Sequence, residues 1–253
     1  MRSLSFRFHA RLLLPLVLSC VLFSASAQAI VLGTLSTLTM HMVRVAGPGG
    51  ALMCSGTVID PLHVVTARHC GPTAVVDRGR WFGVIRRGQS AKLADGRTIT
   101  VTGDALILTL QKPLPATVIP IDIGLQGTDG EFVIAGFGAT REANRGWLGP
   151  LHQASVVVHV PFRLVAPDRM SDISASACFG DSGGAVLRNG KLVGVITRAS
   201  HPHPVIACGH LTHYAPVVAT PHVELHPHDG FEVSAAPRNP QRRLMYRRAF
   251  TPR

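Results

Sequence analysis

The segment at 178–184 reads Cys-Phe-Gly-Asp-Ser-Gly-Gly and places a serine between glycines, directly after an aspartate. A serine hydroxyl is a weak nucleophile until a base accepts its proton. Glycines at its side allow backbone N–H groups to approach a developing oxyanion. The segment at 64–70, Val-Val-Thr-Ala-Arg-His-Cys, supplies a histidine, the side chain best suited to act as that base near neutral pH. Ser182 and His69 are therefore the candidate nucleophile and general base.

The third candidate group is a carboxylate in the segment at 103–108, Gly-Asp-Ala-Leu-Ile-Leu. A buried carboxylate beside an imidazole holds its tautomer and stabilises its charged form. Asp104 fits this task because it stands immediately before an apolar run of strand length. Asp77 and Asp95 are weaker rivals, since each stands close to a glycine in a turn-like stretch.

Around these segments the chain alternates short apolar runs with glycine, proline or aspartate. The 253 residues are 46% hydrophobic, which excludes a largely unfolded chain. Gly at 25 and Pro at 18 favour many turns, and no long stretch has a 3.6-residue period. Asn189-Gly190 between two apolar runs is the strongest hairpin signal. The pattern predicts an all-β protein with strands at 56–59, 64–66, 82–85, 98–101, 105–110, 132–135, 155–160, 185–187 and 192–197.

The amino-terminal segment at 1–29 has the features of a secretory signal peptide. Three arginines accompany the apolar run at 12–23, and Ala-Gln-Ala at 27–29 forms an A-x-A cleavage site. The apolar run is too short for a comfortable membrane span, so no transmembrane segment is predicted. We expect a secreted or periplasmic protein that starts at Ile30. The competing interpretation is a lipoprotein processed at Cys20, which follows Val-Leu-Ser.

Apart from Cys20, the chain has four cysteines. An even number is expected of an exported chain with disulfides. Their order favours pairing within local segments, because each of two pairs then lies in one stretch of the chain. Zinc is the alternative, although the sequence has no CxxC spacing. The expected disulfides are Cys54–Cys70 and Cys178–Cys208.

The carboxyl-terminal part differs in character from the rest. The whole chain has a formal net charge of +11, and the segment at 233–253 carries arginines and no acid. We therefore expect a basic, unfolded tail at 229–253. A solvated tail is the simpler interpretation. Contact with a polyanion is the alternative, and nothing indicates a specific nucleic acid.

Histidines gather in the segment before the tail. Their spacing is irregular and contains no H-E-x-x-H, so exposed loops are favoured over a metal site. We predict no metal and no cofactor. The histidines concerned are His201, His203, His210, His213, His222, His226 and His228.

Five motifs together resemble the trypsin/chymotrypsin-type serine peptidases over 30 to about 218. They are Cys-Ser-Gly-Thr at 54–57, Thr-Ala-Arg-His-Cys at 66–70, Asp-Ala-Leu-Ile-Leu-Thr-Leu at 104–110, Gly-Phe-Gly at 136–138 and Gly-Asp-Ser-Gly-Gly at 180–184. The resemblance implies two packed antiparallel six-stranded β-barrels with the active site in the cleft between them. The protease domain would span 30–228, with the boundary between barrels near 126–136. Relatives usually close with a helix, which Pro221 and Pro227 disfavour here.

The resemblance also implies a role for each residue of the motifs. His69 would be the general base, Asp104 its orienting acid and Ser182 the nucleophile. The backbone N–H groups of Gly180 and Ser182 would form the oxyanion hole. The family's disulfide positions also support the two local pairings.

The resemblance also implies which residues contact the substrate. Ser176 would lie at the base of the primary specificity pocket, and 197–199 would form the substrate-facing strand. Because Ser176 is not an acid, a preference for lysine or arginine is not expected. Arg198 stands where an aromatic residue is usual. The substrate-binding residues carried over are therefore Ser176, Thr197, Arg198 and Ala199.

Family members become active when a new Ile-Val terminus folds inward and pairs with the aspartate before the nucleophile. Here Ile30-Val31 follows the A-x-A site, and Asp181 precedes Ser182. Signal cleavage would itself create this terminus, although Leu32 departs from the usual glycine. A buried ion pair of this kind tolerates no missing partner.

The sequence thus predicts a secreted serine endopeptidase that hydrolyses peptide bonds in protein or peptide substrates through an acyl-enzyme. A neutral, apolar or aromatic residue is expected before the scissile bond, and Arg198 with the nearby histidines leaves an acidic residue open. The alternative is a catalytically silent homologue that acts as a binding module, although no residue of the expected triad is missing.

Overall fold

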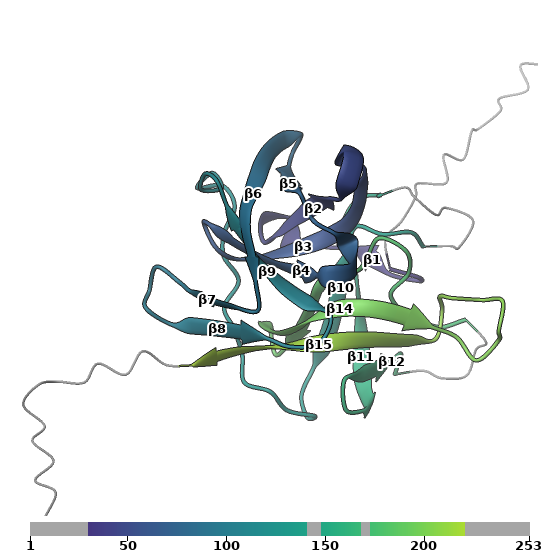
Figure 1. Cartoon of the computed structure of the whole chain (residues 1–253). Coiled ribbons are helices and arrows are strands. Elements are labelled where there is room, and N and C mark those ends of the chain that lie inside the picture. The colour runs from purple at the N-terminus through teal and green to yellow at the C-terminus, as the bar shows by residue number, and fades with distance from the viewer. Residues whose placement is uncertain (1–29, 141–147, 168–172, 221–253) are drawn as a thin grey trace, which may run out of the picture. The chain divides into compact units, whose positions relative to one another are not determined.

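The computed structural model describes residues 30–140, 148–167 and 173–220 (Figure 1). The segments predicted as a signal peptide (1–29) and as a basic tail (229–253) lie outside these ranges. Strands make up nearly all the regular structure. In the described ranges, no helix is long and apolar enough to cross a membrane.

The first barrel is built from residues 42–110 and closes on itself in the order β2-β3-β4-β9-β6-β5, with every neighbouring pair antiparallel. Its interior holds valine and leucine side chains such as Val45, Val64 and Leu108. These alternate with outward-facing residues, as the period of a half-buried strand requires. Its strands are β2 (Met42–Ala46), β3 (Leu52–Asp60), β4 (His63–Ala67), β5 (Ala74–Asp77), β6 (Arg80–Gly88) and β9 (Ala105–Leu110).

The second barrel follows a long connection and also has six antiparallel strands. Strand β12 pairs with both β11 and β15, and this closes the path β11-β10-β13-β14-β15. Phe132, Ile134 and Leu164 fill its interior. The expected Asn189-Gly190 hairpin joins β13 and β14, and both residues have positive φ. The strands are β10 (Phe132–Gly136), β11 (His152–Val160), β12 (Arg163–Val165), β13 (Ala185–Arg188), β14 (Lys191–Ser200) and β15 (Leu211–Thr220).

Three further strands and three short 3-10 turns complete the described structure. Strand β1 lies on the edge of β11, whereas β7 and β8 form a hairpin. Their bounds are β1 (Thr34–Leu35), η1 (Leu38–Met40), η2 (Pro48–Gly50), η3 (Arg68–Cys70), β7 (Ser90–Lys92) and β8 (Thr98–Val101). The prediction of two antiparallel six-stranded barrels is confirmed.

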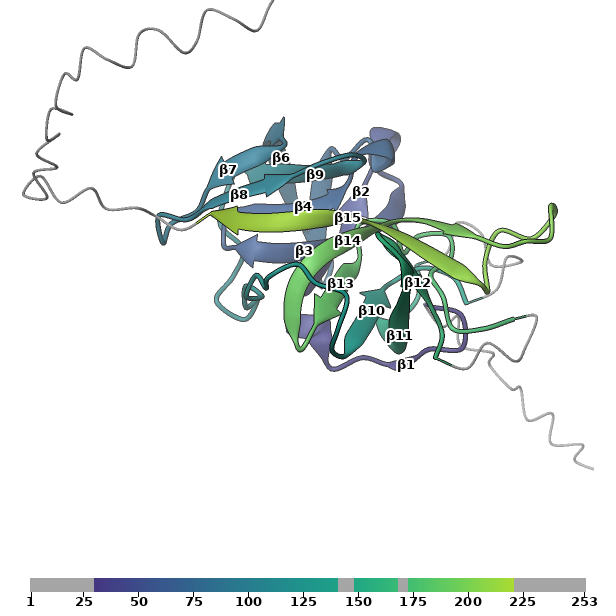
Figure 2. The same cartoon turned by 90° about the horizontal axis from the view of Figure 1, so that it is seen from below.

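The β7–β8 hairpin joins the two halves of the molecule. It belongs to the first half of the chain, but β8 pairs with the last four residues of β15 (Figures 1 and 2). Ile99 and Val101 of β8 are buried with Val217 in the largest apolar cluster, which also includes residues of both barrels. Strand pairing therefore occupies 217–220, and Thr220 Oγ1 donates a hydrogen bond of 3.0 Å to the carbonyl of Thr98.

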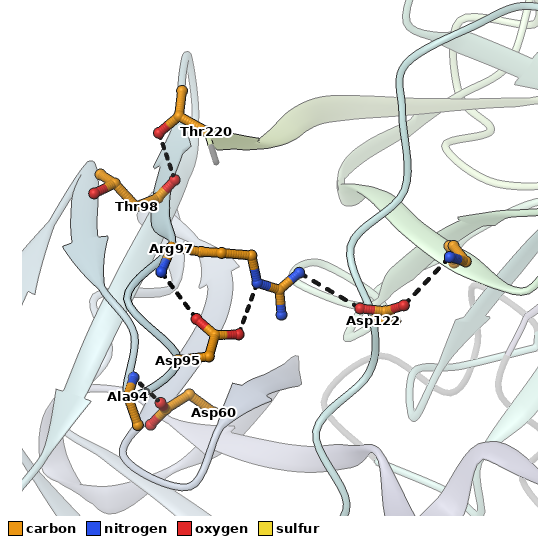
Figure 3. Close-up of polar contacts among 8 residues, drawn as sticks. Asp60, Ala94, Asp95, Arg97, Thr98, Asp122 and Thr220 are labelled. Atoms are coloured by element: carbon orange, nitrogen blue, oxygen red, sulfur yellow. Dashed lines mark hydrogen bonds and ion pairs between the residues drawn. The ribbon is translucent and has the colours of Figure 1, made fainter. Parts of the chain in front are cut away.

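Polar contacts hold the turn of this hairpin against the connection between the barrels (Figure 3). The buried Asp60 carboxylate accepts a hydrogen bond of 2.9 Å from the backbone of Ala94. Arg97 contacts Asp95 at 2.7 Å and Asp122 at 3.5 Å, and Asp122 also pairs with Lys191 of β14 at 3.3 Å. Such exposed ion pairs contribute little stability each, so their main effect is to align the connection.

We predict that Leu108→Ala lowers the free energy of unfolding by about 2–5 kcal/mol, because it leaves a cavity in the first barrel. Leu108 is fully buried, whereas Leu125 is 84% exposed in the connection between the barrels and provides the matched control. Denaturant unfolding of both variants measures the difference. Equal effects of Leu108→Ala and Leu125→Ala would contradict this assignment of the core.

Candidate active site

The three residues singled out from the sequence come from separate elements that meet between the barrels. His69 lies in η3, directly after β4, and Asp104 immediately precedes β9. Strands β4 and β9 are neighbours, with Ala67 opposite Ala105, so both side chains leave the first barrel at one end. Ser182 lies in the loop before β13, on the second barrel.

These side chains form a continuous hydrogen-bonded row. His69 Nδ1 is 2.6 Å from Asp104 Oδ2, and His69 Nε2 is 3.0 Å from Ser182 Oγ. A carboxylate only accepts, so Nδ1 carries the proton, and the lone pair on Nε2 faces the serine hydroxyl. The backbone N–H of His69 also donates to Asp104 Oδ1 at 3.1 Å. The carboxylate therefore fixes both the position of the ring and its tautomer.

The loop that carries Ser182 requires glycine at 183. Gly183 has a φ of +82°, and a Cβ there would collide with the carbonyl oxygen of Ser55 and the hydroxyl of Thr66. Its backbone N–H donates to the carbonyl of Ile196 at 2.7 Å. The loop that carries Ser182 thus packs directly against the first barrel, with no side chain at 183 between them.

Two residues of this loop, Gly180 and Ser182, line a cavity and have backbone N–H groups without a partner in the described ranges. Gly180 has a φ of +91°, and both Gly180 and Ser182 line the cavity beside His69. Within the described ranges, neither N–H donates to an acceptor of the protein. Both donors are thus available to an oxygen atom bound beside Ser182 Oγ.

Ser55 of β3 anchors the loop that carries Ser182. In the sequence, Ser55 is noted only as part of a family motif. Its backbone N–H donates to the carbonyl of Ser182 at 2.9 Å. Its hydroxyl donates to the carbonyl of Gly180 at 2.9 Å and accepts from the backbone of Phe137 at 2.9 Å. The side chain is fully buried, so these bonds have no competition from water.

Asp181 is turned away from the cavity and is fully buried. Burial raises its pKa from 3.8 to about 7, although hydrogen bonds from the backbones of Cys178, Gly138 and Ile30 act in the opposite direction. The nitrogen of Ile30 lies 3.3 Å from Asp181 Oδ2. Ile30 is itself fully buried, so the segment that begins at residue 30 enters the interior of the second barrel.

Two disulfides fasten the elements that border the site. Cys54 of β3 is joined to Cys70, the neighbour of His69. Cys178, which starts the nucleophile loop, is joined to Cys208. The sulfurs of Cys54 and Cys70 lie close to the His69 ring, but as disulfide sulfurs they are not thiolate ligands for a metal.

The first cavity of the cleft has a volume of about 370 Å³, and Ser182 is among the residues that line it. Thr197, Arg198 and Ala199 of β14 line it as well. Ser176 does not, because it is fully buried and its hydroxyl accepts a hydrogen bond of 2.7 Å from the backbone of Gly209. The other lining residues are largely apolar and include Met53, Leu148, Phe179 and Ala207.

A second cavity of about 610 Å³ lies on the other side of the His69–Asp104 pair. Its walls include His213, from the histidine-rich segment near Arg198, and Arg163, which sequence reasoning did not connect with the site. No local motif marks these residues, because strand pairing alone brings them to the cleft. The rival carboxylates Asp77 and Asp95 are engaged elsewhere, with Arg78 at 3.8 Å and Arg97 at 2.7 Å.

The histidine-rich segment is described only up to His213. The rings of His201 and His210 are 5.7 Å apart and meet edge to face. His213 Nε2 lies 2.8 Å from the hydroxyl of Ser200. The other members, at 222–228, lie outside the described ranges.

Solved structures share the fold. A human heparin binding protein superposes with a TM-score of 0.56 at 17% identity, over 74% of this chain and 91% of its own. Neuropsin, a serine protease expressed in the limbic system of mouse brain, gives a TM-score of 0.54 at 19% identity, over 74% and 93%. At these identities the likeness concerns the fold alone.

Sequence comparisons extend the likeness beyond the fold. Serine protease SP24D of Anopheles gambiae is 29% identical over 174 residues, which cover 58% of this chain. The aligned part spans 62% of the length of that relative. The family model described as Trypsin matches residues 33–219, which include both barrels and the His69–Asp104–Ser182 row. The chain therefore belongs to the trypsin family.

Proposed function

We propose that this chain is an exported serine endopeptidase that hydrolyses peptide bonds through an acyl-enzyme. The observation that carries the proposal is the unbroken row in which His69 Nε2 lies 3.0 Å from Ser182 Oγ while Nδ1 lies 2.6 Å from Asp104. The two disulfides support export, because such bonds persist in oxidising compartments.

Acylation begins when Ser182 Oγ attacks the carbonyl carbon of the scissile peptide and His69 Nε2 accepts the hydroxyl proton. Asp104 stabilises the imidazolium that results. The negative charge that develops on the carbonyl oxygen is stabilised by the N–H groups of Gly180 and Ser182. His69 then protonates the leaving amine, and the bond between the carbonyl carbon and nitrogen breaks.

Deacylation repeats these steps with water in place of the serine. His69 Nε2 removes a proton from the water as its oxygen attacks the ester carbonyl. It then gives this proton to Ser182 Oγ as the bond between the carbonyl carbon and Oγ breaks and the carboxylic acid product leaves. The same two N–H groups stabilise the second oxyanion. Every step uses groups of the chain and the substrate, so the mechanism requires no cofactor.

The lining of the first cavity supports a neutral side chain before the scissile bond. The cavity contains no acidic residue from the described ranges, whereas Leu148, Phe179 and Ala207 contribute apolar surface. A lysine or arginine bound there would lose hydration without a carboxylate to compensate. Ser176 and Thr212 are fully buried and do not line the cavity, so neither supplies a charge to it.

Activation by signal cleavage is supported by the backbone at Ile30. Ile30 has a φ of +57°, a conformation that is strained for a β-branched residue. This torsion includes the carbonyl carbon of residue 29, so cleavage after 29 removes the strain. It also converts the Ile30 nitrogen, 3.3 Å from Asp181, into an ammonium group. Cleavage thus places a positive charge beside a buried carboxylate that otherwise has none.

We predict that Ser182→Ala lowers kcat/KM for a cleaved peptide at least about 1,000-fold. It should also abolish labelling by a fluorophosphonate, which reacts with activated serine hydroxyls. Ser90→Ala, at an exposed serine of β7, is the matched control and should change neither readout. If correctly processed wild-type protein resists the label, the chain is a binding module and the proposal is wrong.

We predict that Ser55→Ala lowers kcat about tenfold with a smaller effect on KM, because the loop that carries both oxyanion N–H groups loses its anchor. The buried N–H of Phe137 also loses its acceptor, which costs about 1–3 kcal/mol of stability. Steady-state kinetics and denaturant unfolding measure the two effects, with Ser90→Ala again as control. Normal kcat in a destabilised variant would show that Ser55 has only a structural role.

We predict that stability depends more strongly on pH before cleavage than after it. In a precursor that keeps residues 27–29, the raised pKa of Asp181 means that the folded state binds an extra proton between pH 3.8 and about 7. The precursor is therefore most stable below this window and loses up to about 1.4 kcal/mol per pH unit as pH rises through it. The new ammonium group lowers the pKa of Asp181, so this loss shrinks in the mature form.

Thermal unfolding of both forms from about pH 4 to about pH 7.5 measures the difference, over the window set by the pKa of Asp181. Asp181→Asn in the precursor provides the control and should remove the loss of stability with rising pH. The same pH profile in precursor and mature protein would exclude the proposed ion pair.

A further inference from the structure

A row of basic side chains crosses three neighbouring strands beside the candidate active site. In the register of the second barrel, His213 of β15 lies opposite Arg163 of β12 on one side and Arg198 of β14 on the other. Residues directly opposite one another project from the same face of a sheet. The buried neighbours Thr212 and Tyr214 point inward, so the row lies on the outer face of the barrel.

This outer face forms the wall of the second cavity. All three basic residues line it together with His69 and Asp104. Arg198 also lines the first cavity, so the row reaches the position of the nucleophile. A peptide bound at Ser182 therefore passes alongside the row.

Neither arginine of the row has a hydrogen-bond or ion-pair partner in the part of the chain that the structure describes. Within 30–140, 148–167 and 173–220, the guanidinium groups of Arg163 and Arg198 make no hydrogen bond or ion pair, and both side chains are exposed. Among the residues that line the second cavity, the only acid is Asp104, which is engaged by His69. The cavity wall thus carries two uncompensated positive charges.

The surroundings of His213 disfavour its charged form. Partial burial, followed by the charges of Arg198 and Arg163, lowers the pKa of His213. The lowered pKa leaves His213 uncharged near neutral pH, so the charges of the row are those of the two arginines on either side of β15. A bound anion would compensate these two charges, whereas in the free protein only solvent and salt screen them.

The turn between β11 and β12, which directly precedes Arg163, has a strained backbone. Phe162 precedes Arg163 and has a φ of +62°, which is unusual for an aromatic residue. Its ring meets Tyr214 edge to face at 5.6 Å, and its carbonyl accepts a hydrogen bond of 3.1 Å from the backbone of Tyr214. The packing thus holds the β11–β12 turn, and with it Arg163, against β15.

We propose that the Arg163–His213–Arg198 row is a subsite for a carboxylate side chain of the substrate, within the four residues before the scissile bond. This inference rests on the proposed function and on residues 197–199 of β14 forming the substrate-facing strand, as the family resemblance implies. The substrate class is then a peptide with a neutral residue at the scissile bond and an aspartate or glutamate shortly before it. Arg163 and Arg198 would be specificity-determining residues.

A peptide explains the location of the row better than a large polyanion does. A polyanion binds through charges spread over a wide surface. Here the two arginines line one cavity together with the general base, beside Phe162. A single side chain on a peptide backbone fits that setting.

The test compares peptides that carry glutamate or the isosteric glutamine at each of the four positions before one scissile bond. Wild-type protein should cleave the glutamate peptide about tenfold faster in kcat/KM at one of these positions. The preference should shrink between about 50 mM and about 500 mM sodium chloride. Arg163→Gln and Arg198→Gln should each move the ratio toward one, and Arg163→Glu should favour a lysine peptide instead.

Arg80→Gln is the matched control, because Arg80 is an exposed arginine of β6 in the first barrel. It should leave the glutamate-to-glutamine ratio unchanged. A ratio near one at all four positions in wild-type protein that reacts with a fluorophosphonate would overturn the subsite while leaving the proposed function intact. A preference that survives both arginine substitutions would overturn it as well.

The same peptides also test the row without catalysis. Their binding to Ser182→Ala is measured by calorimetry, where the glutamate peptide should bind about tenfold more tightly than the glutamine peptide. This comparison decides the subsite even if the fluorophosphonate shows that the wild-type protein is inactive. Equal binding of the two peptides, or a heparin oligosaccharide that binds in a manner dependent on Arg163 while the peptides do not, would overturn the subsite.

Discussion

The candidate site depends on the direct backbone contact between the loop that carries Ser182 and strand β3 of the other barrel. The N–H of Ser55 binds the carbonyl of Ser182, and Gly183 fits against the carbonyl of Ser55 because it has no side chain. Each barrel has its own apolar core, so nothing within either core sets the distance between His69 and Ser182. These contacts between the barrels set it. Their position in a fully buried layer allows no water to replace them.

The same loop contains the buried carboxylate of Asp181. Asp181 accepts three backbone hydrogen bonds, yet burial still raises its pKa. The loop is therefore formed around a group whose charge is incompletely compensated in the uncleaved chain. In the proposed activation, the new ammonium group at Ile30 compensates it, and this couples proteolytic processing to the loop that holds the nucleophile and the oxyanion donors.

The second half of β15 shows how this chain joins its halves. Its residues 217–220 pair with β8. The β7–β8 hairpin of the first half of the chain thereby becomes part of the sheet of the second barrel. The apolar cluster that contains Ile99, Val101 and Val217 also includes residues of both barrels, so the pairing stabilises the contact on which the cleft depends.

The sequence by itself determined the strand content, the fold family, the residue types of the hydrogen-bonded row and the cysteine pairs, since each depends on local patterns or short motifs. Only the tertiary structure decided the roles of residues without a motif, such as Ser55 and Arg163. These depend on the register between distant strands, and a shift of one residue turns a side chain to the other face of the sheet. The register shift between Ile196 and Arg198 brings Arg198 opposite His213, and it becomes visible only when β14 and β15 are paired. Ser176 is fully buried, which the sequence does not encode locally.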